Sequence, residues 1–148
     1  MNREIKYRGK CLVDIGNIIK GDWVFGGISY DTDRVWIDMP YYGQILVDKE
    51  TVGQYTGLHD ENGKEIYEGD IIEFSYDIFT GNFDTKVGKG IVEFIGGAFY
   101  IKPFEIEGKK VEDIDNEEWF LLYTVNTDTL EVIGNLHENL ELLGGEDE

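Results

Sequence analysis

The placement of glycine is the feature that most constrains the fold of this chain. Its 148 residues include 19 glycines and only two prolines, so glycine is about twice as frequent as its average usage of roughly 7%. Glycine tolerates the backbone conformations of tight turns and weakens long helices. The segments between the glycines are short and alternate apolar with polar residues, which is the period of a half-buried strand. The sequence therefore predicts a turn-rich β protein.

Eight segments carry the strand pattern. Gly96-Gly97 separates two of them and predicts a tight hairpin, because both central residues of such a turn need positive φ. We expect a mainly β (β-rich α+β) fold, with short twisted strands in a barrel- or sandwich-like arrangement and one or two short helical turns. The predicted strands cover residues 4–8, 22–30, 33–39, 45–47, 71–76, 90–95, 98–103 and 128–135.

Other segments are less regular. Asp48 follows a short apolar run and is expected to cap a single helical turn. Asn135, with Glu138 three residues later, resembles a capping box and predicts a short terminal helix or turn. Residues 119–125 form an apolar run too short for its period to distinguish a buried strand from a helical turn.

Two polar stretches lack a core pattern. Residues 77–90 are expected to form a loop or hairpin tip, which is where a binding function is commonly placed. Residues 107–118 are expected to be solvated.

The length fits one domain spanning residues 1–148, or two lobes of about 1–58 and 64–143, followed by an acidic tail at 144–148. No solenoid repeat or low-complexity linker divides the chain.

The formal charge is −18, from 13 basic and 31 acidic residues. The three acidic residues of the tail account for little of this, so the domain surface itself is acidic. Affinity for nucleic acid depends on neutralising phosphates with Lys and Arg. Direct nucleic-acid binding is therefore not expected, and the simplest role of the charge is solubility.

Cysteine content and hydropathy bear on location. Cys11 is the single cysteine, so no disulfide forms within the chain and the thiol is expected to act as a small apolar side chain. The first ten residues lack the apolar run of a signal peptide, and no stretch approaches the ~18 apolar residues of a membrane span. We expect a cytoplasmic protein without a membrane partner.

The most distinctive stretch, TVGQYTGLHDENGKEIYEGDII at 51–72, suggests three interpretations. As a calcium loop with Gly63 at its sixth position, it places Leu58 where Asp is required and Gly69 where a bidentate Glu is required. As a phosphate loop, its glycines at 53, 57, 63 and 69 have the wrong spacing, and no Lys-Ser/Thr pair follows them. Both of these interpretations fail.

The third interpretation is a turn between strands. Asn62-Gly63 is a preferred central pair of a two-residue hairpin turn, because both residues tolerate positive φ. Gly69-Asp70 then turns the chain into the strand that starts at Ile71.

The same stretch offers a candidate contact surface. Tyr55, His59 and Tyr67 flank the predicted turns, and we expect them to be exposed and available for contact with a partner.

Candidate metal and catalytic residues are few. A zinc site requires three or four ligands in register, and His59, His137 and Cys11 are far apart in sequence. Neither histidine lies in a recognisable nucleophile context. We expect no metal, no cofactor and no enzymatic activity.

Several segments resemble the YopX family of phage and prophage proteins. They are REIKYRGK at 3–10, GDWVFG at 21–26, VDKETVGQYTGLHDENGKEIYEGDII at 47–72, GIVEFIGGAFYIK at 90–102 and LEVIGNLHENLELL at 130–143. The most specific is QYTGLHDENGKEIYEGD, in the family's own order. The resemblance implies a small, mostly β protein of the bacterial cytoplasm that is encoded by a phage or prophage and self-associates. It implies no catalytic residues.

Two functions follow as hypotheses. The first is a non-enzymatic accessory or interaction module that forms a homo-oligomer or binds a host or phage protein, with the basic strand of Arg3, Lys6, Arg8 and Lys10 meeting acidic surface on a neighbour. The second is an acidic decoy that imitates nucleic acid and occupies a host DNA-binding protein. An enzyme of nucleic-acid or nucleotide metabolism ranks third, and it requires a concave pocket with converging polar groups.

Overall fold

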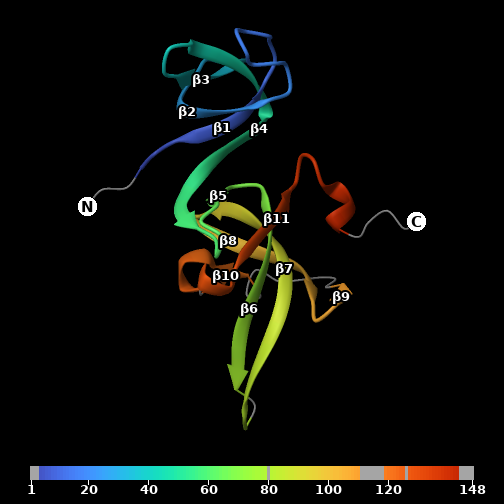
Figure 1. Cartoon of the computed structure of the whole chain (residues 1–148). Coiled ribbons are helices and arrows are strands. Elements are labelled where there is room, and N and C mark those ends of the chain that lie inside the picture. The colour runs from blue at the N-terminus through green and yellow to red at the C-terminus, as the bar shows by residue number, and fades with distance from the viewer. Residues whose placement is uncertain (1–3, 80, 111–118, 126, 144–148) are drawn as a thin grey trace. The chain divides into compact units, whose positions relative to one another are not determined.

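The structure, a computed structural model, describes residues 4–79, 81–110, 119–125 and 127–143. It is mostly β, as predicted, and the helical part of these residues consists of short 3-10 turns. The chain divides into two compact units, Met1–Gly57 and Leu58–Glu148. The boundary follows Gly57 and falls within β4, and Figure 1 labels the strands of each unit.

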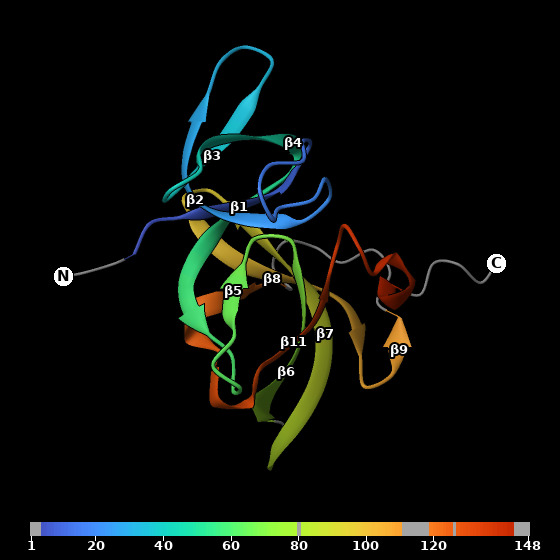
Figure 2. The ribbon, with the colours of Figure 1, turned by 45° about the horizontal axis from the view of Figure 1, so that its top comes forward.

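The first unit is a small closed sheet. Its strands are β1 (Tyr7–Cys11), β2 (Trp23–Tyr30), β3 (Val35–Met39) and β4 (Gly43–His59), whose last two residues belong to the second unit. β1 pairs with both β2 and β4, while β3 pairs with β2 and β4, all antiparallel. Four strands thus close into a ring, as the barrel-like prediction required. Figure 2 shows the β2–β3 hairpin extending from this ring.

Each strand of this ring contributes one or two side chains to its interior. Its buried cluster consists of Cys11, Val24, Ile37, Ile45 and Val47. Cys11 is only 1% exposed, and its Sγ donates to the Ile19 carbonyl at 3.0 Å. The cysteine therefore behaves as the small buried side chain that the sequence suggested.

The expected helical turn after Asp48 is wrong, because β4 continues through it. The Asp48 carboxylate accepts the Glu50 N–H at 3.0 Å, and the Asp48 carbonyl accepts the Thr51 hydroxyl at 2.6 Å. Thr51 Oγ1 in turn accepts the Lys10 N–H of β1 at 2.9 Å. Such local bonds from Asp and Thr compete with helix formation, and here they produce a bulge in the β1–β4 register.

The second unit contains an antiparallel sheet in the order β10-β8-β7-β6-β11, with β9 paired to β8. Its strands are β6 (Asp70–Phe79), β7 (Phe83–Ile95), β8 (Ala98–Ile106), β9 (Lys109–Lys110), β10 (Phe120–Leu121) and β11 (Glu131–Asn135), and β5 (Glu65–Tyr67) precedes them. The 3-10 turns are η2 (Leu122–Thr124), η3 (Thr127–Thr129) and η4 (Leu140–Leu143). The apolar run at 119–125 thus supplies both of its alternatives, a short strand followed by a helical turn.

The core of this unit collects side chains from the sheet and from the segment after β10. Its buried members are Ile66, Ile72, Phe74, Val92, Ile101, Leu122, Val125, Leu130 and Val132. Ile72 and Phe74 share one face of β6 as the alternation predicted, and Tyr76 packs against the same cluster.

Residues 77–90, expected to form a loop or hairpin tip, make the outer part of a long hairpin, so the hairpin alternative is confirmed and the loop alternative is wrong. β6 and β7 pair continuously from Ile71↔Ile91 to Phe79↔Phe83, whereas the register of β11 with β6 ends at Glu73. Residues 74–79 of β6 lie beyond the pairing with β11, and residues 83–87 of β7 lie beyond the pairing with β8, which begins at Gly88. We call these residues the β6–β7 arm. Figures 1 and 2 both show it leaving the body of its sheet. Of the other polar stretch, residues 111–118 lie outside the described residues.

The predicted turns lie where the sequence placed them. Gly96 (φ 62°) and Gly97 (φ 88°) form the two-residue connection between the Ile95↔Ala98 pair, as expected. At the other turn, Gly63 has a φ of 81°, but Asn62 does not have positive φ. The Gly63 N–H donates to the Asp60 carbonyl at 3.0 Å, and the Asp60 N–H donates to the Lys64 carbonyl at 2.8 Å.

The two-residue form of this turn is therefore wrong. Glu61, Asn62 and Gly63 make a three-residue loop in which only the glycine is left-handed, a common alternative hairpin connection. The cause is Asp60, whose Oδ1 accepts the N–H groups of Asn62 and Lys64, each at 2.9 Å.

The same carboxylate also reaches a distant strand. Asp60 Oδ2 accepts the Val132 N–H of β11 at 2.9 Å, and the next residue, Glu61, donates its N–H to the Leu130 carbonyl at 2.9 Å. Asp60 is 6% exposed. Burial alone raises the pKa of Asp60, but the hydrogen bonds from Val132, Lys64 and Asn62 outweigh burial and hold this pKa below its ordinary value.

Gly69-Asp70 starts β6, as predicted, although the strand begins at Asp70. Gly69 has a φ of 94°. Its N–H donates to the Val92 carbonyl at 2.9 Å, and its carbonyl accepts the Leu136 N–H at 2.8 Å. Asp70, 2% exposed, accepts the Tyr67 N–H through Oδ2 at 2.8 Å.

The terminal cap is also present. Asn135 Oδ1 accepts the N–H groups of His137 and Glu138 at 2.9 and 3.0 Å, and Asn135 Nδ2 donates to Glu138 Oε1 at 3.0 Å. The bond from the Glu138 N–H is that of a capping box, but the reciprocal bond differs, because Glu138 accepts the side-chain amide of Asn135 and the Asn135 backbone N–H donates to Asn139 Oδ1 at 3.0 Å. The helix that follows is limited to the single 3-10 turn η4.

Replacing Asp60 with Asn should destabilise the protein. An amide accepts through one atom only, so its NH2 group faces the Val132 N–H or the pair Asn62 and Lys64, leaving buried donors unpaired. Hydrogen bonds to charged groups contribute about 1.5–3 kcal/mol each, and we expect a loss of about 2–4 kcal/mol in the free energy of unfolding. Urea denaturation followed by circular dichroism measures it.

The Asp60 carboxylate also predicts an acid dependence. Because its folded-state pKa is lowered, its stabilisation is complete above the unfolded-state pKa of about 4 and is lost as pH falls through the folded-state pKa. The Asp60→Asn variant should lose less stability than the wild type between about pH 5 and pH 2. Asp38→Asn, which changes an exposed carboxylate, is the control. Equal acid losses in wild type and Asp60→Asn would refute this role.

Gly90 provides a steric prediction. A Cβ at this position would lie 2.6 Å from Ile101 Cγ2 and 2.8 Å from the Lys102 carbonyl oxygen, where β7 and β8 shift register. Because the Lys102 carbonyl belongs to the backbone of a paired strand and cannot move without distorting it, Gly90→Ala should lower the free energy of unfolding by about 2 kcal/mol. Gly27→Ala is the matched control, because its nearest atom would be Asp38 Oδ2 at 3.8 Å. Equal urea midpoints for the two variants would contradict the prediction.

Candidate functional site

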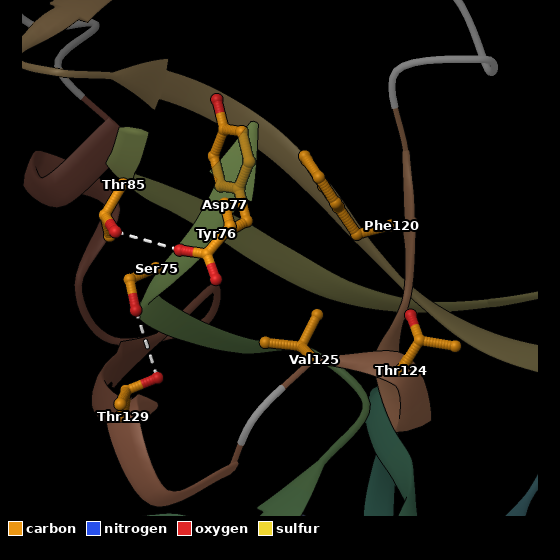
Figure 3. Close-up of a pocket in the computed structure, with 8 residues that line it drawn as sticks. All are labelled: Ser75, Tyr76, Asp77, Thr85, Phe120, Thr124, Val125 and Thr129. Atoms are coloured by element: carbon orange, nitrogen blue, oxygen red, sulfur yellow. Dashed lines mark hydrogen bonds between the residues drawn. The ribbon is translucent and has the colours of Figure 1, made fainter. Parts of the chain in front are cut away.

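A pocket on the second unit combines polar groups with aromatic rings. Its volume is about 520 Å³, within the range of small-molecule sites. Strands β6, β7 and β10 and the turns that follow β10 all contribute to it, as Figure 3 shows. The lining residues are Ser75, Tyr76, Asp77, Thr85, Phe120, Thr124, Val125 and Thr129. We call it the Asp77 pocket.

Hydrogen bonds fix two of its polar pairs (Figure 3). Asp77 and Thr85 are direct cross-strand partners, and the Thr85 hydroxyl donates to Asp77 Oδ1 at 2.8 Å. Ser75 Oγ and Thr129 Oγ1 lie 3.1 Å apart and connect β6 to η3 across 54 residues of sequence. Both bonds hold the lining side chains in place before any ligand arrives.

The aromatic part of the lining is anchored in the core. The rings of Tyr76 and Phe120 lie 4.7 Å apart at 46°, and both contact Phe74, with ring centroids at 5.8 and 5.1 Å. Phe74 is 1% exposed, so these rings are held by a fixed partner.

This arrangement is suited to binding. The Ser75 hydroxyl is bonded to the Thr129 hydroxyl. The described residues contain no group of three or more His, Cys, Asp or Glu side chains able to hold a metal ion. Within the same residues, no helix has the length and hydrophobicity needed to span a bilayer.

A second depression, of about 410 Å³, lies on the same sheet and is lined by Glu73, Val87, Gly88, Lys89, Glu105, Glu107 and Gly108. Its charged groups are engaged with the protein itself. Lys89 Nζ lies 3.6 Å from Glu105 Oε2, and Glu107 Oε2 accepts the Val87 N–H at 2.6 Å. It is a weaker candidate for this reason.

The expected contact surface is not formed. Tyr55 and Tyr67 are 5% and 2% exposed, so their predicted exposure is wrong, and His59 alone is exposed. Alternate residues of β4 are buried in this region, and Tyr55 belongs to the buried set together with Thr51 and Gly53.

Tyr67 is buried where β5 ends. Its hydroxyl donates to Glu65 Oε1 at 2.9 Å and its N–H to Asp70. Asn62, Gly63, Gly69 and Asp70 act as turn residues, as the sequence analysis proposed.

Only part of the Asp77 pocket could be predicted from the sequence. Asp77 and Thr85 come from residues 77–90, which are expected from the sequence to be a loop or hairpin tip suited to binding and which form part of a hairpin. The sequence does not indicate that Ser75, Phe120 and Thr129 line a pocket. Ser75 and Thr129 are 54 residues apart, and no local pattern shows that such distant residues meet.

Comparison with known proteins gives the family. Residues 13–144 match the family model described as YopX protein, which spans both units and includes the turn motif at 60–70. No curated protein matches the chain. Because this match covers most of the sequence, the chain belongs to the YopX family.

Proposed function

We propose that this protein is a non-enzymatic interaction module that self-associates through the β6–β7 arm. The observation that carries the proposal is the pair of aromatic side chains at the end of the arm. Phe79 and Phe83 are 64% and 82% exposed, and their rings contact each other at 4.9 Å between centroids. Large apolar groups gathered on a projecting element mark an interaction site.

The backbone of the arm supports the same function. An isolated two-stranded hairpin is only marginally stable in water, and beyond Glu73 the arm has left the register of β11. A strand edge of this kind pairs readily with another chain. On the other edge of the arm, residues 83–86 of β7 lie beyond the β8 register, which begins at Gly88; a second copy that added a strand there would extend the sheet and place its side chains beside Phe79 and Phe83.

The biological setting also belongs to this proposal. Membership of the YopX family supports an accessory protein encoded by a phage or prophage and working in the cytoplasm of a bacterial host. A host or phage protein is the other partner that the same arm would suit.

The test is self-association of the double variant Phe79→Ser/Phe83→Ser. Burying one phenylalanine contributes about 1.5–3 kcal/mol, so removing two per copy should weaken association by at least about 100-fold. Sedimentation velocity over a wide range of protein concentration measures this. Tyr123→Ser is the matched control, because Tyr123 is an aromatic residue of the same unit that is 76% exposed outside the arm.

Two results would count against the proposal in different ways. A wild-type protein that stays monomeric at high concentration and moderate salt would refute self-association. A wild-type oligomer unaffected by the double variant would refute the role of the arm.

The acidic decoy is the alternative function, supported only by the charge of −18. It predicts that the protein recovers a basic nucleic-acid-binding protein from host lysate at low salt, with no dependence on Phe79 or Phe83. Recovery lost in the double variant would favour the arm.

A further inference from the structure

We propose that the Asp77 pocket binds an organic cation, a guanidinium or primary ammonium group on an alkyl stem. Free polyamines such as agmatine carry this chemistry, and so does the side chain of an arginine or lysine on a partner. The proposal concerns a site separate from the phenylalanine pair of the arm and does not depend on self-association.

The charge of the pocket selects for a cation. Asp77 is the charged residue among the described residues that line it, and the chain as a whole carries −18. A negative surface concentrates cations and repels phosphates and carboxylates. The ligand is therefore positively charged.

The Asp77 carboxylate is positioned to receive such a ligand. Its Oδ1 accepts the Thr85 hydroxyl at 2.8 Å, which fixes the orientation of the group. A carboxylate offers about four lone-pair sites over its two oxygens, so the Thr85 bond leaves acceptor capacity for the N–H groups of a guanidinium or ammonium.

The aromatic lining suits the rest of such a ligand. Tyr76 and Phe120 line the pocket with ring centroids 4.7 Å apart, on the face of β6 opposite Ser75 and Asp77 because side chains alternate along a strand. Aromatic rings attract cations and also pack against alkyl groups. Val125, 9% exposed, adds an apolar contact for the stem.

Hydroxyl groups complete the match. Ser75, Thr124 and Thr129 line the same pocket, and hydroxyl oxygens accept hydrogen bonds from N–H groups that the carboxylate does not reach. A neutral sugar would use these hydroxyls and the rings and would donate O–H groups to Asp77, but it would form no ion pair with the carboxylate. The test below separates the two ligand classes.

The experiment measures binding to the full chain by isothermal titration calorimetry with four probes. They are agmatine, a short acetylated peptide containing one arginine, the same peptide with citrulline in place of arginine, and methyl glucoside. Citrulline keeps the shape and most N–H groups of arginine but is uncharged. The protein variants are Asp77→Asn, which removes the charge at constant shape, and Asp38→Asn, which makes the same change at an exposed site outside the pocket.

We expect agmatine and the arginine peptide to bind the wild type, and Asp77→Asn to weaken both by at least about tenfold. Asp38→Asn should leave both affinities within about twofold, and citrulline should bind at least about tenfold more weakly than arginine. Equal affinity for agmatine and the peptide would identify a free cation as the ligand. Tighter binding of the peptide would identify a side chain of a protein partner.

Three results would overturn the proposal. They are no binding of either cation at millimolar concentration, equal binding of the arginine and citrulline peptides, or equal losses in Asp77→Asn and Asp38→Asn. Methyl glucoside binding that exceeds cation binding and survives Asp77→Asn would assign the pocket to neutral sugars instead. Matching circular dichroism spectra and urea midpoints of the two variants establish that each is folded.

Discussion

The second unit depends on one buried carboxylate. Asp60 accepts three backbone N–H groups, two within its own turn and one from β11, which is 72 residues away in sequence. The lowered pKa of Asp60 shows that these bonds more than offset the cost of burying the charge. One side chain thereby shapes the hairpin before β5 and attaches it to the edge strand of the sheet.

The stretch at 51–72 contains a second residue that connects distant parts of the second unit. Gly69 adds backbone bonds to Val92 on β7 and to Leu136 after β11, at a φ of 94° that favours glycine. The stretch that first suggested a metal or phosphate loop is thus the segment through which three parts of the second unit are connected. Asp60, Gly69 and Asp70 in this segment all make hydrogen bonds with the backbone.

Surfaces available for function lie away from this motif. Strands β6 and β7 are longer than their neighbours. Their hairpin therefore carries Phe79 and Phe83 beyond the core. The Asp77 pocket forms where β6 passes the turns after β10. The arm and the Asp77 pocket both result from the length of β6 and β7. The arm offers apolar surface to another chain, and the Asp77 pocket offers a carboxylate, hydroxyls and rings to a cation.

Except for β4 beyond Asp48 and residues 83–89 of β7, for which the sequence predicts no strand, local patterns in the sequence indicate the main strands and the bends. Alternation of apolar residues places them, and Gly96-Gly97, Gly63 and Gly69 mark turns through conformations that other residues adopt only at a cost. These are local properties. Four features come only from long-range contacts: the ring closed by β1, the bulge after Asp48, the burial of Tyr55 and Tyr67, and the contact between Ser75 and Thr129. Each of these depends on which distant segments lie together, and a period of two is the same whichever partner a strand acquires.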